Sequence, residues 1–260
     1  MKIAFFDCFS GASGDMFVGA LLDAGLPIER LDQELQKLAV SGFGLRAKKV
    51  QKGALSGTKF DVDVDERHVH RRLRDMLQIV NQSRLCEGVK AKCSDIFEHL
   101  ARAEASIHDC DVHDVRFHEL GNLDSIIDVI ASVTALELLG VQTAYCSRIH
   151  IGTGFVSCRH GDLPVPAPAT LELLKGLPVY SRGIEGELVT PTGAALLRNL
   201  CTGFGPMPAM RIESIGYGAG SRDLGIPNML RVCIGEALAD EQDQDQLTLI
   251  TPDVHMITKE

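Results

Sequence analysis

The densest group of side chains able to do chemistry lies in the run HELGNLDSIID, residues 118–128. Asp124 and Asp128 are four residues apart in a helical pattern, so they share one helix face. If His118 and Glu119 fold back over the start of that helix, the four side chains form a ligand set for a divalent transition metal. The alternative is structural, with Asp124 as a helix cap and Asp128 in solvent. We favour the metal site because the apolar residues around Asp128 indicate a mostly buried helix.

A second reactive segment is the Gly/Ser loop DCFSGASGD, residues 7–15, between a predicted strand and a predicted helix. Glycine lets successive backbone N–H groups converge on one point, and a helix N-terminus favours an anion there. We therefore interpret the loop as a phosphate cradle, with Asp7 placed to hold a cation beside the anion. A tight turn that only caps the helix is the alternative. The predicted binding residues are Ser10, Gly11, Ser13, Gly14 and Asp15.

Two later loops carry further candidate ligands. Cys158 and His160 lie two residues apart and can reach one metal ion, although a buried thiol and a hydrogen-bonded imidazole explain them equally well. In the run TPTG, Thr190, Thr192 and Gly193 open a predicted helix, so a ligand can approach its N-terminus. Helix capping alone is the alternative for the threonines.

Two runs are interpreted mainly as surface segments. GYGAGSRD, residues 216–223, indicates a mobile arm whose cation, Arg222, can pair with a phosphate or carboxylate; a simple turn is the alternative. HDCDVHD, residues 108–114, contains two His, one Cys and three Asp at the end of an exposed helix. We interpret it as a solvated acidic loop, with weak metal affinity as the alternative.

The elements that must position these residues follow from hydrophobic periodicity. Strands are predicted at 2–6, 45–51, 58–65, 143–151, 210–216 and 228–235. Helices are predicted at 15–24, 28–39, 67–109 with a break near 83–88, 124–139, 170–175 and 192–200. The strands at 45–51 and 58–65 are expected to form a hairpin with one wet face.

The pattern predicts an α+β (mixed α/β) fold with a strand–loop–helix start, a hairpin, an inserted helical segment, and then mixed strands and helices. We assign residues 1–240 to one metal- and nucleotide-handling domain, with 67–114 as a helical subdomain. Residues 241–260 are expected to form a linker and the truncated start of a C-terminal domain.

Composition limits the function. The chain has 260 residues and a net charge of −9, which argues against binding to nucleic acid or to an anionic membrane surface. No stretch reaches the ~20 apolar residues of a membrane span. The N-terminus is predicted to be a strand with no signal peptide, and the eight cysteines lack disulfide-like spacing. We therefore expect a cytoplasmic protein with no nucleic-acid or membrane partner.

Five strings, in this order, resemble one known family: DCFSGASGDMFVGALLDAG, FHELGNLDSIIDV, GFVSCRHGDLPVPAPATLELLKG, GIEGELVTPTGAALL and IGYGAGSRDLGIPNMLRV. They are similar to the nickel insertion proteins that complete the nickel-pincer nucleotide cofactor of lactate racemase. The similarity extends from Met1 to about Glu236. It implies a nickel insertase or chelatase of the lyase class. Such a protein inserts Ni²⁺ into pyridinium-3,5-bisthiocarboxylic acid mononucleotide, forming a carbon–metal bond with CTP hydrolysis coupled.

The resemblance also implies roles for the residues above. The two loops and Arg222 would hold the mononucleotide substrate. The nickel ligands would come from His118, Glu119, Asp124, Asp128, Cys158 and His160. Metallation of a ring carbon releases a proton, for which Asp7, Glu119 and Asp128 are the candidate acceptors.

Two features depart from the family pattern. Arg116 stands where the family commonly has His, so a cation replaces one candidate ligand. The segment LTLITPDVHMITKE resembles only the start of the C-terminal portion, which the resemblance associates with CTP bound with Mg²⁺ or Mn²⁺. We therefore expect a separate C-terminal chain as a partner needed for activity, with apo lactate racemase as another partner. A non-enzymatic nickel or nucleotide carrier, and a metal-dependent hydrolase of a phosphorylated small molecule, are the alternatives.

Overall fold

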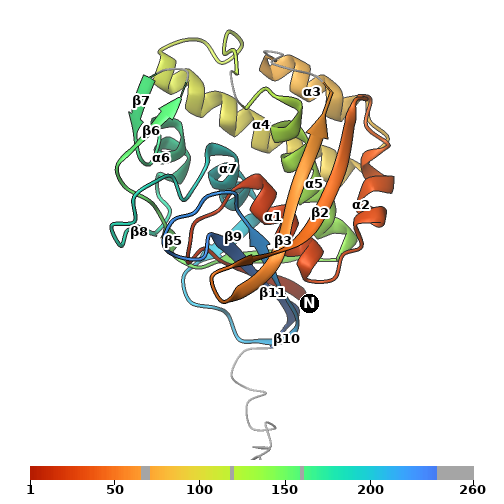
Figure 1. The fold of residues 1–260 in the computed structure, drawn as a ribbon. Coiled ribbons are helices and arrows are strands. Elements are labelled where there is room, and N and C mark those ends of the chain that lie inside the picture. The colour runs from red at the N-terminus through yellow and green to blue at the C-terminus, as the bar shows by residue number, and fades with distance from the viewer. Residues whose placement is uncertain (66–70, 118–119, 159–160, 239–260) are drawn as a thin grey trace, which may run out of the picture.

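The computed structural model describes residues 1–65, 71–117, 120–158 and 161–238 (Figure 1). The predicted ligands His118, Glu119 and His160, and the predicted linker at 241–260, lie outside the described residues. Within the described ranges, no helix is long and apolar enough to cross a membrane.

A mixed sheet of seven strands runs through the described part of the chain, in the spatial order β2-β3-β10-β11-β1-β4-β9. β1 pairs antiparallel with β11 and parallel with β4, and β2 and β3 form the predicted hairpin. The strands are β1 (Lys2–Asp7), β2 (Phe43–Lys52), β3 (Leu55–Val64), β4 (Thr143–Cys146), β9 (Cys201–Phe204), β10 (Met210–Ala219) and β11 (Met229–Ala237). Two small sheets pair β5 (Ile149–His150) with β8 (Val179–Tyr180), and β6 (Phe155–Cys158) with β7 (Gly161–Pro164).

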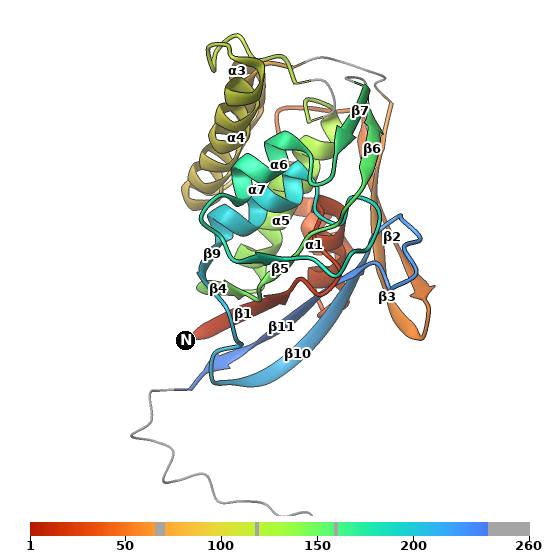
Figure 2. The ribbon, with the colours of Figure 1, turned by 90° about the vertical axis from the view of Figure 1, so that its left-hand side faces the viewer.

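Helices α1, α5 and α7 lie on one side of this sheet (Figure 2). Of these, α1 packs against β3, β10 and β11, α5 against β3, and α7 against β4 and β9. They are α1 (Gly14–Asp23), α2 (Ile28–Leu35), α3 (Leu73–Asn81), α4 (Glu87–His108), α5 (Leu123–Leu138), α6 (Pro168–Leu174) and α7 (Pro191–Leu200). The sheet and helices together confirm the predicted mixed α+β class. In the described part of the predicted helical run, α3 and α4 are separated at the expected break, and their buried side chains belong to the same hydrophobic cluster as those of β1 and α1. Residues 67–70 of that run lie outside the described residues.

Glycines allow α1 to lie directly on β10. A Cβ atom at Gly218 would come within 1.8 Å of the Met16 carbonyl oxygen, and one at Gly216 within 2.0 Å of the Ala20 carbonyl oxygen. Only glycine permits this separation between helix and strand. Because α1 cannot slide along β10, the loop that precedes the helix is fixed as well.

The structure corrects several local predictions. The predicted strand at 143–151 is divided into β4 and β5, and the hairpin β6–β7 and strand β9 were not predicted. Gly216–Ala219 belong to β10, so that half of the predicted mobile arm is wrong. The expected wet face of β3 is also wrong near its middle, since Thr58 and Lys59 are buried there.

Candidate functional site

A cavity of about 570 Å³ collects side chains from segments far apart in the sequence. The first Gly/Ser loop, the N-terminal turns of α5 and α7, the end of α4 and the hairpin β6–β7 all contribute to its wall. Predicted site residues on the wall are Ser13, Gly14, Asp15, Asp128, Thr190, Thr192 and Arg222. Glu104, His108 and Glu187 also line it and were not among the predicted site residues, although His108 begins the run for which weak metal affinity was the alternative.

Backbone contacts join the two predicted anion loops. The Ala12 N–H donates to the Leu188 carbonyl at 3.0 Å, and the Thr190 N–H donates to the Ala12 carbonyl at 3.1 Å. Gly11 has φ +85°, and a Cβ there would lie 2.0 Å from the Leu188 carbonyl oxygen. Gly11 therefore allows the two loops to contact each other closely. The starts of α1 and α7 lie beside each other on the cavity wall.

Thr190 caps α7 as predicted, because its hydroxyl accepts the Gly193 N–H at 3.1 Å. Gly193 packs against the first loop, where a Cβ would lie 2.1 Å from the Ala12 carbonyl oxygen. Packing against the first loop therefore requires a residue without a side chain at position 193, while Thr192 lines the cavity.

Asp128 lies where α5 meets the start of α1. A Cβ on Gly14 would come within 2.7 Å of Asp128 Oδ2, so the small residue makes room for this carboxyl group. Burial raises the pKa of Asp128 well above its ordinary value, and the nearby carboxylates of Asp15 and Asp124 raise it further. Asp128 therefore holds a proton more tightly than a solvated aspartate does.

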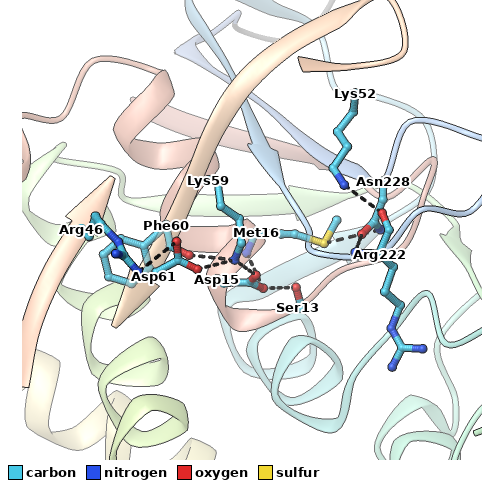
Figure 3. Close-up of polar contacts among 10 residues, drawn as sticks. All are labelled: Ser13, Asp15, Met16, Arg46, Lys52, Lys59, Phe60, Asp61, Arg222 and Asn228. Atoms are coloured by element: carbon cyan, nitrogen blue, oxygen red, sulfur yellow. Dashed lines mark hydrogen bonds and ion pairs between the residues drawn. The ribbon is translucent and has the colours of Figure 1, made fainter. Parts of the chain in front are cut away.

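Lys59 on β3 forms an ion pair with Asp15, a residue of the cavity wall (Figure 3). Its ammonium group contacts Asp15 Oδ2 at 2.5 Å and Asp61 Oδ1 at 3.1 Å, and donates to the Phe60 carbonyl at 2.9 Å. Burial alone lowers the pKa of Lys59, but the two carboxylates outweigh burial and the pKa lies above its ordinary value. The other oxygen of Asp15 accepts the Ser13 hydroxyl and the Met16 N–H. Both Asp15 oxygens are thus occupied within the protein.

Arg222 enters the cavity from the loop after β10 (Figure 3). Its guanidinium donates to Glu187 Oε2 at 2.8 Å. Its backbone is fixed by the Asn228 side chain and by Lys52, which donates to the Arg222 carbonyl at 3.0 Å. The predicted cation is therefore held at the wall by neighbouring side chains.

The end of α4 was predicted to be a solvated surface segment, yet its last turn lines the cavity. Glu104 Oε2 and His108 Nε2 lie 3.4 Å apart, one turn from each other on the helix. A sequence signal existed, because a Glu and a His at i and i+4 share one helix face. It was missed because the acidic run that follows suggested solvent on all sides.

Other predicted residues lie away from the cavity wall. Asp7 forms an ion pair with Arg231 across the β1–β11 pair, and Ser10 is fully buried with no hydrogen-bond partner for its hydroxyl among the described residues. Asp124 Oδ1 accepts the Ser125 N–H at 2.8 Å. Cys158 ends β6, and its proposed partner His160 is not described. In the described ranges, no three His, Cys, Asp or Glu side chains form a ready metal cluster.

Comparison with known proteins gives a consistent result. A family model described as "Nickel insertion protein" matches residues 4–257. The pyridinium-3,5-bisthiocarboxylic acid mononucleotide nickel insertion protein of Desulfitobacterium hafniense (strain DSM 10664 / DCB-2) is 50% identical over 241 residues, which cover 93% of this chain and 60% of that protein. The protein of the same name from Geobacillus kaustophilus is 48% identical over 247 residues, which cover 91% of this chain and 60% of that protein.

The chain therefore spans about 60% of the length of these relatives. No solved structure matches it. Because the family model covers nearly the whole chain and these relatives are about half identical to it, the chain belongs to the nickel insertion protein family.

Proposed function

We propose that the cavity holds pyridinium-3,5-bisthiocarboxylic acid mononucleotide while Ni²⁺ is inserted into it, as the names of the relatives suggest. The observation that supports this most directly is the cavity itself, which combines a cation, a capped helix start and acidic side chains. A volume of about 570 Å³ lies within the range of small-molecule sites. The chain would act as a nickel chelatase of the lyase class.

The polarity of the wall suggests how the mononucleotide lies. Arg222 and the N-terminal turn of α7 at Thr190 and Thr192 favour a phosphate group. Ser13 already donates its hydroxyl proton to Asp15, so it offers a phosphate no donor. We therefore assign the phosphate to the Arg222 side and the pyridinium ring to the side of Asp128.

Asp128 is the proposed proton acceptor. Insertion forms a bond between nickel and a ring carbon and breaks the carbon–hydrogen bond, so one proton must leave the ring. A carboxylate whose pKa is raised by burial takes up a proton more readily than a solvated one. Asp128 also stays a predicted nickel ligand, together with His118, Glu119, Asp124, Cys158 and His160. Asp7 is omitted from this proposal because Arg231 neutralises it.

We further propose that insertion requires CTP with Mg²⁺ or Mn²⁺, and that the completed cofactor passes to apo lactate racemase. The relatives are longer than this chain, which covers about 60% of each. Reconstitution with the C-terminal portion of a full-length relative, with and without CTP, tests the coupling: the proposal requires that nickel incorporation depend on CTP.

The phosphate assignment is tested with Arg222→Gln and two ligands, the mononucleotide and its dephosphorylated nucleoside. If Arg222 faces the phosphate, the variant binds the mononucleotide at least about tenfold more weakly and the nucleoside equally well. Arg211→Gln, on an exposed part of β10, is the matched control. Equal losses for both ligands would exclude the phosphate contact. Tight binding of intact mononucleotide with no nickel incorporated under full reconstitution would indicate a carrier.

A further inference from the structure

Two apolar side chains of the hairpin β6–β7 line the cavity. Val156 on β6 and Leu163 on β7 are directly opposite each other in the strand register, and both belong to the cavity wall. Residues that are opposite in an antiparallel pair share one face, and the next residue along the strand lies on the other face. That next residue is Phe155, which is 73% exposed. The hairpin therefore turns an apolar pair toward the cavity and leaves its other face in solvent.

The hairpin is fixed at its base but has little support along its strands. The Val165 N–H donates to the Gly154 carbonyl at 2.9 Å, and β7 leads directly into α6, which begins at Pro168 (Figure 1). Within the described ranges, neither strand packs extensively against another helix or strand. A two-stranded hairpin on its own is only marginally stable in water. Because Val156 and Leu163 are both partly exposed, they gain packing when a ligand fills the cavity beside them.

The wall next to the hairpin adds further apolar groups. Ile107, in the last turn of α4, is 43% exposed and lines the cavity, as do Ala167 and Pro168 at the start of α6. Helices α4 and α6 pack against each other, so these residues belong to neighbouring elements. The groups that favour a phosphate come from other elements, namely the start of α7 and the loop that carries Arg222. A mononucleotide has a phosphate at one end and a flat ring at the other, and an apolar wall suits the faces of the ring.

We propose that Val156 and Leu163 are the ring-contact pair of the cavity, which packs against one face of the pyridinium ring of the mononucleotide. The inference rests on the proposed function, because it identifies the residues that recognise the ring of the same ligand. The two thiocarboxylate groups are substituents at the edge of the ring, so a contact with the face leaves that edge open to Ni²⁺ and to Asp128. The contact also removes water from the ring face, which makes the affinity depend on the ring and not on the phosphate.

The pair is tested by titrating the full chain, without nickel, with the mononucleotide and with its dephosphorylated nucleoside. Leu163→Ala should weaken the binding of both ligands by about tenfold, because it removes three carbon atoms from the contact with the ring. Leu163→Met keeps the volume of the side chain and should bind both ligands within about threefold of wild type. The matched control is Phe155→Ala, on the exposed face of the same hairpin, which should bind both within about twofold of wild type. Arg222→Gln, in contrast, should weaken the mononucleotide alone.

The outcomes separate this inference from the proposed function. If the wild type binds the mononucleotide and Leu163→Ala binds it equally well, the ring contact is overturned and the proposed function stands. A loss for the mononucleotide alone, or an equal loss in Phe155→Ala, would also overturn the ring contact, because the first indicates a phosphate contact and the second a general need for the hairpin. If the wild type binds neither ligand, the proposed function fails and the ring contact fails with it. Circular dichroism melting of each variant confirms that a loss of binding is not a loss of fold.

Discussion

Replacing Lys59 by Met tests the charge network that fixes the first loop. The variant keeps the length of the side chain and removes the ammonium group from a position that is 11% exposed. Asp15, whose side chain is 22% exposed, then faces the protein without its cation. Removing one partner of a buried ion pair costs about 3–5 kcal/mol.

A second argument limits that cost. Asp15 is 22% exposed and keeps the Ser13 hydroxyl and the Met16 N–H as hydrogen-bond donors, so part of its desolvation stays offset. We therefore expect the variant to lose about 3 kcal/mol at pH 7, the lower end of that range. The pKa of Lys59 is raised, so the wild-type ammonium is charged at pH 7 and its contribution is lost only at alkaline pH.

The assay is urea unfolding at pH 7 followed by circular dichroism. The matched control is Lys49→Met, which removes a 68% exposed lysine from an ion pair with Asp23 at the other end of α1. That variant should lose no more than about 1 kcal/mol. A cost for Lys59→Met that equals that of the control would refute the reasoning.

Three further variants test other parts of the structure. Burial raises the pKa of Asp128 in the folded protein, so folding stability falls as the pH rises above the ordinary pKa of an aspartate. Asp128→Asn removes this cost and should stabilise the ligand-free protein at pH 8. In a pH series of urea unfolding, the gain should vanish near about pH 4. Gly218→Ala places a Cβ 1.8 Å from a helix carbonyl and should cost about 3 kcal/mol or more in urea unfolding. Gly88→Ala, with open space at the start of α4, should instead stabilise by about 0.5–1 kcal/mol, and the opposite order would contradict the packing argument. Thr190→Ala removes the cap of α7 and should cost about 1 kcal/mol, measured the same way; no loss would mean that the cap is dispensable.

The long elements were predictable because their apolar residues repeat with the period of a helix or a strand. Helix α5 is the clearest case, since its buried side chains follow the predicted pattern within one residue at each end. The hairpin β6–β7 lacked such a signal because it is mostly exposed, with Phe155 73% accessible. Strand β9 is short and follows α7 directly, so the sequence offered no break between them.

The site was predictable only in part, for a physical reason. Thr190 and Ser13 were predicted because hydroxyl residues beside a helix start suit both capping and anion binding; the structure shows Thr190 as the cap of α7 and places both residues on the cavity wall. Lys59 was missed because strand alternation assigns it to solvent, and only the packing of α1 against β3 buries it. His108 was missed for the opposite reason, since a polar run hid its place on the cavity wall.

The central claim is that nickel and the mononucleotide meet in one cavity beside Asp128. It is tested most directly by titrating Ni²⁺ into the purified chain by calorimetry, with and without saturating mononucleotide, for wild type and Asp128→Asn. Ligands that share a site are thermodynamically coupled, so the account predicts that the mononucleotide tightens nickel binding about tenfold or more in the wild type, and that this gain is largely lost in the variant. Nickel binding that is unchanged by the mononucleotide, or a gain that persists in full in Asp128→Asn, would contradict the account.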